Sequence, residues 1–163
     1  MQTSIRFEHC LTVVLGFEGG YSNDPADPGG ITNLGITFDE WHKWQQQHGM
    51  KLSTIPEFRD NLTRSDVAPI YWENYWVPSH AVTFPPSFDM CVFDCAVNEG
   101  VGKAHQLLDA TSDIKNVSDR MDAFMNLRVQ HYNAIAIGAK AKFLPGWLSR
   151  VHQLQKMIGA GTI

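Results

Sequence analysis

The sequence predicts an all-α or mainly α fold in one chain of domain size. Apolar residues recur at helical spacing in several segments, and no segment alternates apolar and polar residues with the period of a strand. The densest turn-forming stretch, YSNDPADPGGITNLG, follows the first helical segment. At 163 residues the chain can bury a substantial core, and helices packed on helices would form that core.

The first helix is expected to end at or near Glu18, because Gly19 and Gly20 follow it directly. Thr3 or Ser4 can cap its start. The apolar residues that share one face of this helix are Phe7, Leu11, Val14 and Phe17. The turn-rich stretch after it predicts a long loop, or loops with a short hairpin.

Five further helices are expected. Thr37 opens one that Gly49 closes, and Pro69 fits best in the first turn of the next. Ser87 caps the run FDMCVFDCAVNEG, which is apolar nearly all round and predicts a buried central helix. The approximate ranges are 37–49, 67–76, 88–100, 119–135 and 147–158.

Charge is distributed unevenly along the chain. Residues 1–100 carry 5 Lys and Arg against 13 Asp and Glu, a net −8, whereas residues 101–163 carry 8 against 4, a net +4. The second part can therefore meet an anionic surface, although ordinary solvated faces also explain the split. We find neither a dense basic stripe typical of nucleic-acid binding nor an apolar run long enough for stable membrane insertion.

The three cysteines are Cys10, Cys91 and Cys95, an odd number without a CxxC pair. Cys91 and Cys95 are one helical turn apart in an apolar run, which favours buried free thiols and synthesis in a reducing compartment. Within the same run, Asp94 is expected to pair with Arg128 or Arg150, because a buried acid needs a partner.

Glu18 is the clearest candidate for chemistry. An acid at the last turn of a helix lies where the helix dipole disfavours its ionised form. Glycosidases need such a protonated carboxyl to give a proton to the leaving glycosidic oxygen. A solvent-facing glutamate near a helix end is the alternative interpretation.

The loop after Glu18 supplies further polar groups. Asp24 and Asp27 can each be a second carboxylate, and the Thr32 hydroxyl can hold a water molecule. Either aspartate can instead form a turn before proline. The sequence contains no HExxH motif, no EF-hand spacing and no GxSxG, so we expect neither a metal nor a serine nucleophile.

The stretch EGGYSNDPADPGGITNLGIT resembles the signature of the glycoside hydrolase family 108 muramidases, found among phage endolysins and secreted wall-remodelling proteins. The resemblance continues through IYWENYW and FDCAVNEG, where Glu99 departs from the family's usual phrase. LPGWLSRV near Trp147 is similar to the region that the family has as a predicted peptidoglycan-binding part. The resemblance implies a lysozyme-like catalytic part at 1–100 and a binding part at 101–163, packed into one globule.

The resemblance implies a peptidoglycan hydrolase that cleaves the β-1,4 bond between N-acetylmuramic acid and N-acetylglucosamine without a cofactor. Glu18 matches the catalytic Glu of the EGGY motif. Glu18, Asp27 and Thr32 are together similar to the Glu, Asp, Thr triad of phage-type lysozymes, although the interval from Asp27 to Thr32 is one residue shorter. A lytic transglycosylase and a non-catalytic peptidoglycan-binding protein are the alternatives.

Aromatic residues are candidates for substrate binding, because sugar rings stack on them. Tyr21 lies beside Glu18 and is the first choice, with Asp24, Tyr132 and Trp147 as further candidates. Asn98 can hydrogen-bond an N-acetyl group, orient Glu18 or cap its own helix. The aromatic residues for which a place in the core is the more frequent alternative are Tyr71, Trp72, Tyr75 and Trp76.

The expected partners are the glycan strands of peptidoglycan. The apolar stretch at 11–17 lacks an A-x-A-like cleavage site, so we interpret it as a mature helix and not as a signal peptide. We expect synthesis in the bacterial cytoplasm and action in the periplasm or cell wall, reached through a holin or a dedicated secretion system.

Overall fold

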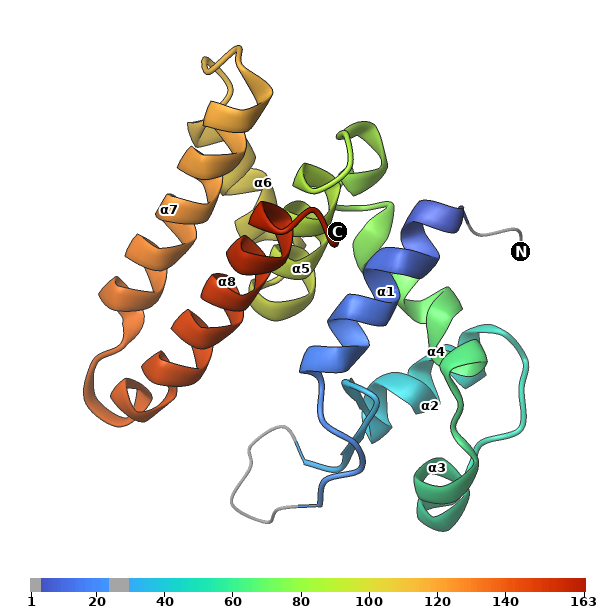
Figure 1. Ribbon diagram of the computed structural model, residues 1–163. Coiled ribbons are helices and arrows are strands. Elements are labelled where there is room, and N and C mark those ends of the chain that lie inside the picture. Colours follow the sequence, from blue (N-terminus) through green and yellow to red (C-terminus); the bar gives the residue numbers. More distant parts are fainter. Residues whose placement is uncertain (1–3, 24–29) are drawn as a thin grey trace. The chain divides into compact units, whose positions relative to one another are not determined.

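The computed structural model describes residues 4–23 and 30–163. It is mainly helical, as predicted, and divides into two compact units, Met1–Glu73 and Asn74–Ile163. Figure 1 shows the helices of each unit and the short hairpin in the first. No helix within the described ranges is both long enough and apolar enough to cross a bilayer. The predicted boundary at residue 100 stays a prediction.

In the residues of the first unit that the structure describes, there are four α-helices and a two-stranded antiparallel hairpin. They are α1 (Ile5–Phe17), β1 (Thr32–Asn33), β2 (Ile36–Thr37), α2 (Phe38–Gln47), α3 (Ile55–Asn61) and α4 (Arg64–Tyr71). The buried apolar face of α1 consists of Phe7, Cys10, Leu11 and Val14. The Ser4 hydroxyl oxygen accepts a hydrogen bond from the Phe7 N–H and caps this helix, as one of the two expected residues.

The hairpin confirms one of the two expectations for the turn-rich stretch. Thr32 pairs with Thr37 and Asn33 with Ile36, so two residues, Leu34 and Gly35, form the turn. Their φ angles are +49° and +73°. Two positive φ angles in succession define the turn type that matches the twist of paired strands.

Two features around α4 differ from the sequence prediction. The helix begins at Arg64 instead of 67, because Thr63 and Asp66 form a capping box at its start. Pro69 is therefore its sixth residue, beyond the first turn, where it has no N–H to donate to the Ser65 carbonyl. After Tyr71 the chain continues as a π-helix, Trp72–Trp76, while α3 was not predicted at all.

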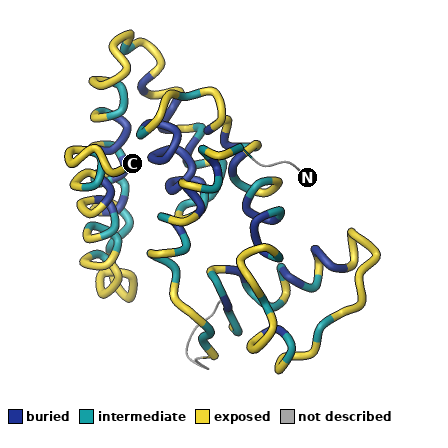
Figure 2. Tube along the Cα trace, turned by 45° about the vertical axis from the view of Figure 1, so that its right-hand side comes forward, coloured by how far each residue is buried: buried dark blue, intermediate teal, exposed yellow. Residues whose placement is uncertain are grey.

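The second unit is built around the expected buried helix. Its α-helices are α5 (Phe88–Glu99), α6 (Val101–Ala110), α7 (Val117–Ile135) and α8 (Leu144–Gly159), with short 3-10 segments at Ala81–Thr83 and Gly138–Phe143. The first nine residues of α5, 88–96, are all buried. Figure 2 shows buried residues in dark blue on these helices, with exposed turns around them.

Ser87 precedes α5 as predicted but does not cap it through its side chain. Its φ is +75°, and its hydroxyl donates a hydrogen bond to the Ile163 carbonyl oxygen at 2.8 Å. Ser87 thereby ties the end of the chain to the start of α5. At the other end, Gly100 has a φ of +90° and separates α5 from α6, a helix that was not predicted.

Candidate active site

Glu18 lies where the sequence predicts, at the end of α1. It is the C-cap residue: its N–H still donates to the Val14 carbonyl at 3.1 Å, while its own backbone is extended, with φ −72° and ψ 142°. The residue is half-buried. Glu18 thus leaves the helix at a defined point, and the neighbouring elements of the first unit control where its carboxyl group lies.

The turn of the hairpin packs against Glu18. A Cβ atom added to Gly35 would lie 2.7 Å from Cγ and 3.1 Å from Cδ of Glu18. The same Cβ would lie 2.3 Å from the hydroxyl oxygen of Tyr71. Real Cβ atoms do not approach other atoms so closely, so the backbone of Gly35 fits between the two side chains only because it carries none.

Two side chains fix the hairpin from other elements of the first unit. The Tyr71 hydroxyl, on α4, donates a hydrogen bond to the Leu34 carbonyl oxygen at 3.1 Å. The Asn33 amide donates to the carbonyl oxygens of Phe58 at 2.8 Å and Arg59 at 3.1 Å, both on α3. These hydrogen bonds hold Leu34 to α4 and Asn33 to α3.

Thr32 lies on β1, in the segment that returns beside the residues after Glu18. Its N–H donates to the Ser22 carbonyl at 3.0 Å, and the Ser22 N–H donates to the Thr32 carbonyl at 2.9 Å. Thr32 is half-buried, and within residues 4–23 and 30–163 its hydroxyl makes no hydrogen bond. Tyr21 precedes Ser22 and is half-exposed. Asp24 and Asp27 lie outside the described residues.

The aromatic run before and within the π-helix belongs largely to the core. Tyr71 is fully buried, and Trp72 packs edge-on against Phe7 with ring centroids 5.0 Å apart. In the second unit, Trp76 packs in the same way against Phe93 at 5.2 Å. These contacts favour the core interpretation over sugar stacking for Tyr71 and Trp76.

The three predicted binding residues of the second unit lie together. The Tyr132 hydroxyl donates to the Asn98 side-chain oxygen at 2.5 Å, and the Trp147 ring stacks on Tyr132 with centroids 5.2 Å apart. Tyr132 is buried, which raises the pKa of its hydroxyl, whereas Asn98 is exposed and Trp147 half-exposed. Tyr132 thus orients Asn98 and supports Trp147.

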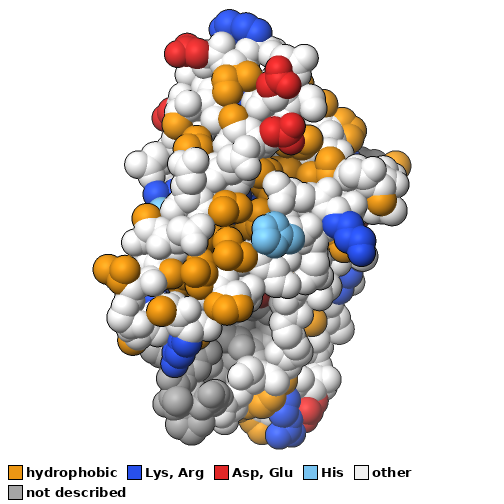
Figure 3. All heavy atoms as spheres, turned by 60° about the vertical axis from the view of Figure 1, so that its left-hand side comes forward, with side chains coloured by type: hydrophobic (Ala, Val, Ile, Leu, Met, Phe, Trp, Pro, Cys, Tyr) orange, Lys and Arg blue, Asp and Glu red, His pale blue; other side chains and the backbone are white. Residues whose placement is uncertain are grey.

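Apolar surface surrounds this aromatic group. Phe143 is 49% exposed and lies 5.9 Å from the Trp147 ring, and Ile137 nearby in the chain is 74% exposed. Figure 3 shows hydrophobic side chains gathered at the surface, with a histidine and charged side chains among and around them. Sugar rings and other apolar ligands can stack on such exposed aromatic rings.

A buried ion cluster lies beneath these residues. As predicted, Asp94 is paired, and it contacts both candidate arginines: Arg128 at 3.0 Å and Arg150 at 2.8 Å. Glu99 adds a second acid, 2.8 Å from Arg128. No local pattern in the sequence predicts this role of Glu99. The negative charges of the two acids balance the positive charges of the two arginines. We therefore interpret the cluster as a structural feature of the second unit.

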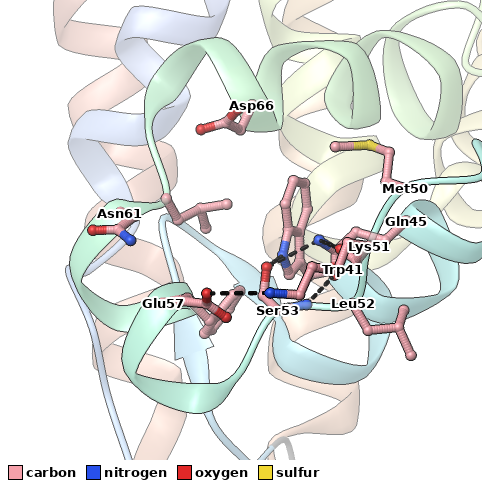
Figure 4. A pocket seen from close by; sticks show the side chains of 11 residues that line it. Trp41, Gln45, Met50, Lys51, Leu52, Ser53, Glu57, Asn61 and Asp66 are labelled. Carbon is pink, nitrogen blue, oxygen red and sulfur yellow. Dashed lines mark hydrogen bonds and ion pairs between the residues drawn. The ribbon is translucent and has the colours of Figure 1, made fainter.

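The first unit also contains a pocket of about 280 Å³ between α2, the following loop, α3 and α4 (Figure 4). Trp41 and Phe58 line its apolar side, while Glu57 and Asp66 contribute carboxylates. Both carboxylates complete capping boxes, with Thr54 and Thr63 respectively. We therefore assign Glu57 and Asp66 to helix capping.

An acid at the end of the first helix, held against a hairpin turn, is suited to donate a proton to the leaving oxygen of a glycosidic bond. The chain belongs to the glycosyl hydrolase 108 family, whose model matches residues 11–100. It is therefore a glycoside hydrolase of the lysozyme or muramidase type that acts on peptidoglycan, and the family resemblance of its motifs is confirmed.

The chain is also similar to a solved structure described as "Structure of Brucella abortus SagA". The two share 26% sequence identity over 94% of each chain, with a TM-score of 0.75. No curated protein matches the sequence. The family match ends at residue 100, so the peptidoglycan-binding role of residues 101–163 stays a prediction.

Proposed function

We propose that this enzyme is an N-acetylmuramidase that hydrolyses the β-1,4 bond between N-acetylmuramic acid and N-acetylglucosamine. The observation that carries the proposal is the placement of Glu18 at the end of α1, with its side chain packed against the turn glycine Gly35. A general acid needs a defined position, because it must reach the leaving oxygen within hydrogen-bond distance.

In this proposal the Glu18 carboxyl donates its proton to the glycosidic oxygen as the bond from that oxygen to C1 of N-acetylmuramic acid breaks. N-acetylglucosamine leaves with a free 4-hydroxyl. Water adds to C1 and gives its proton to a second carboxylate, for which Asp27 is the first choice and Asp24 the alternative. The Thr32 hydroxyl, which makes no bond within the described residues, holds that water.

Substrate contacts are proposed in each unit. Tyr21 and Asp24 follow the acid closely in the sequence, and we propose that they contact the sugar next to the cleaved bond. In the second unit, the exposed Asn98 amide can bind an N-acetyl group, and Trp147 offers a half-exposed ring for stacking. Tyr132 contributes through these two residues, which it holds by a hydrogen bond and a ring contact.

The biological role that we propose is host lysis or cell-wall remodelling. The enzyme would be made in the bacterial cytoplasm and reach the periplasm or wall through a holin or a secretion system. The loss of wall integrity on expression with and without a holin, measured as culture turbidity, tests the delivery route.

Product analysis tests the reaction itself. Purified peptidoglycan is digested, the products are treated with borohydride, and their masses are measured. A muramidase leaves reducing N-acetylmuramic acid, which borohydride reduces. Products of the 1,6-anhydro type, which lack one water and resist reduction, would instead identify a lytic transglycosylase. In that case Glu18 keeps its role as acid, and the water-handling roles of Asp27 and Thr32 are withdrawn.

A further inference from the structure

We propose that Tyr71 and Gly35 are positioning residues for the catalytic acid: Tyr71 holds the hairpin turn, and the turn glycine holds the side chain of Glu18. This inference rests on the proposed role of Glu18 as proton donor. Neither residue touches the reacting bond in this proposal. Both act through the place that they give to the carboxyl group.

Tyr71 and Glu18 lie close to one another at Gly35. The Tyr71 hydroxyl oxygen and the Glu18 Cγ atom lie within 2.3 Å and 2.7 Å of one point, the Cβ position of Gly35. The two atoms are therefore no more than about 5 Å apart. Three residues that are far apart in the sequence, at the end of α1, in the hairpin turn and on α4, thus meet at the Cβ position of Gly35.

Tyr71 and Glu18 differ in how firmly the surrounding structure holds them. Tyr71 is fully buried, and its hydroxyl is committed to the Leu34 carbonyl. Leu34 has a φ of +49°, a conformation that non-glycine residues seldom adopt and that the surrounding structure must hold. Glu18, by contrast, is only half-buried and lies at the C-cap of α1. A change in the turn will therefore displace Glu18 before it displaces Tyr71.

Position 35 requires glycine for two reasons. Gly35 has a φ of +73°, which disfavours any other residue, and a Cβ there would collide with both neighbours. Small misplacements of a catalytic group can reduce turnover by roughly a hundredfold. The turn therefore limits the Glu18 side chain to positions on one side of Gly35.

The main test is Tyr71→Phe, which keeps the buried ring and removes only the hydroxyl. The matched control is Thr111→Val in the second unit, which also removes one buried hydroxyl, here bonded to the Leu107 carbonyl at 3.0 Å. Steady-state kinetics on soluble oligomers of alternating N-acetylglucosamine and N-acetylmuramic acid, together with thermal unfolding, are measured for wild type and both variants.

We expect Tyr71→Phe to lower kcat by roughly tenfold or more with KM within about twofold, because orientation and not binding is lost. Thr111→Val should lose similar thermal stability and keep its kcat. The proposal is overturned if Tyr71→Phe keeps wild-type kcat, or if its KM rises while kcat is unchanged.

Gly35→Ala is the second variant, with an expected loss of kcat larger than that of Tyr71→Phe. If it does not fold, Tyr71→Phe still decides the question. Glu18→Gln separates this inference from the proposed function. Full activity in a folded Glu18→Gln protein removes the proposed function itself, whereas an inactive Glu18→Gln protein with an unaffected Tyr71→Phe protein removes the positioning role alone.

Discussion

Gly35 occupies a position from which any side chain would collide with Glu18, at 2.7 Å from its Cγ atom. The acid and the turn therefore cannot be altered independently. A carboxyl group at a helix end is ordinarily free to rotate, but here the backbone of a two-residue turn closes one side of its range. The catalytic assignment and the shape of the hairpin are thus parts of one local structure.

Replacing Glu18 by glutamine should abolish lysis of peptidoglycan. The amide has the same shape but cannot donate the proton, so we expect a loss of activity of at least about a hundredfold with a nearly unchanged melting temperature. Glu73→Gln, an exposed acid of the same unit, is the control and should keep wild-type activity. Substantial lysis by folded Glu18→Gln protein would remove the assignment.

Two asparagine variants can identify the second carboxylate of the active site. Asp27→Asn should cost more activity than Asp24→Asn, because Asp27 has the lysozyme-like interval from Glu18. Both changes keep side-chain size and remove one negative charge. Rates of turbidity loss on purified cell walls rank the two variants, and the reverse order would transfer the role to Asp24.

Thr32 is expected to act through its hydroxyl. Thr32→Val keeps the β-branched shape that suits a strand, so pairing with Thr37 and Ser22 should survive while the hydroxyl is lost. We expect turnover to fall by about tenfold, less than the loss of about a hundredfold or more expected for a general acid or base, because Thr32 only positions the water. Thr32→Ser restores a hydroxyl and should recover most of it. Equal activity in the valine and serine variants would argue against a role in holding water.

The buried ion cluster should contribute to the stability of the second unit. Arg128→Met leaves Asp94 and Glu99 buried without their shared partner, and breaking such pairs costs about 3–5 kcal/mol. Arg59→Met breaks an exposed pair with Asp60, which water and salt screen, so its loss of unfolding free energy should be much smaller. Urea unfolding of both variants checks this order. Equal losses of unfolding free energy would show that the buried cluster stabilises the fold no more than an exposed ion pair does.

The cysteines should be free but unreactive in the native enzyme. All three are buried, and burial raises the pKa of the Cys91 thiol to about 12 and also raises that of Cys95. Since the thiolate is the reactive form, a thiol reagent at pH 8 should titrate three groups only after denaturation without reductant. A mass lower by two hydrogens would instead indicate a disulfide.

The same thiols predict a pH dependence of stability. A thiol pKa that is higher in the folded than in the unfolded chain stabilises the fold fully below about pH 9 and progressively less as pH rises toward 12. Unfolding free energy should therefore fall over this range, and Cys91→Ala should fall less steeply than wild type. Parallel curves for the two proteins would contradict the prediction.

Local signals were enough to predict much of the first unit. The end of α1 at Glu18, the short hairpin, the start of α2 at Thr37 and the candidate acid all follow from residues that are neighbours in the chain. The buried helix α5 also follows, because a segment apolar nearly all round can only be stable inside a core. Capping and turn chemistry act over a few residues, so sequence alone specifies them.

The tertiary structure alone decided which distant residues meet. Tyr71 was one aromatic candidate among several, and only the packing of α4 beside the hairpin places its hydroxyl on Leu34 and next to Glu18. In the same way, Asp94 had two candidate partners, Arg128 and Arg150. The packing of α5 with α7 and α8 brings both to Asp94 and also pairs Glu99 with Arg128. The sequence determined the acid and the helix that carries it. The position of its carboxyl group depends on contacts between segments more than fifty residues apart, Glu18 and Tyr71, which no local pattern encodes.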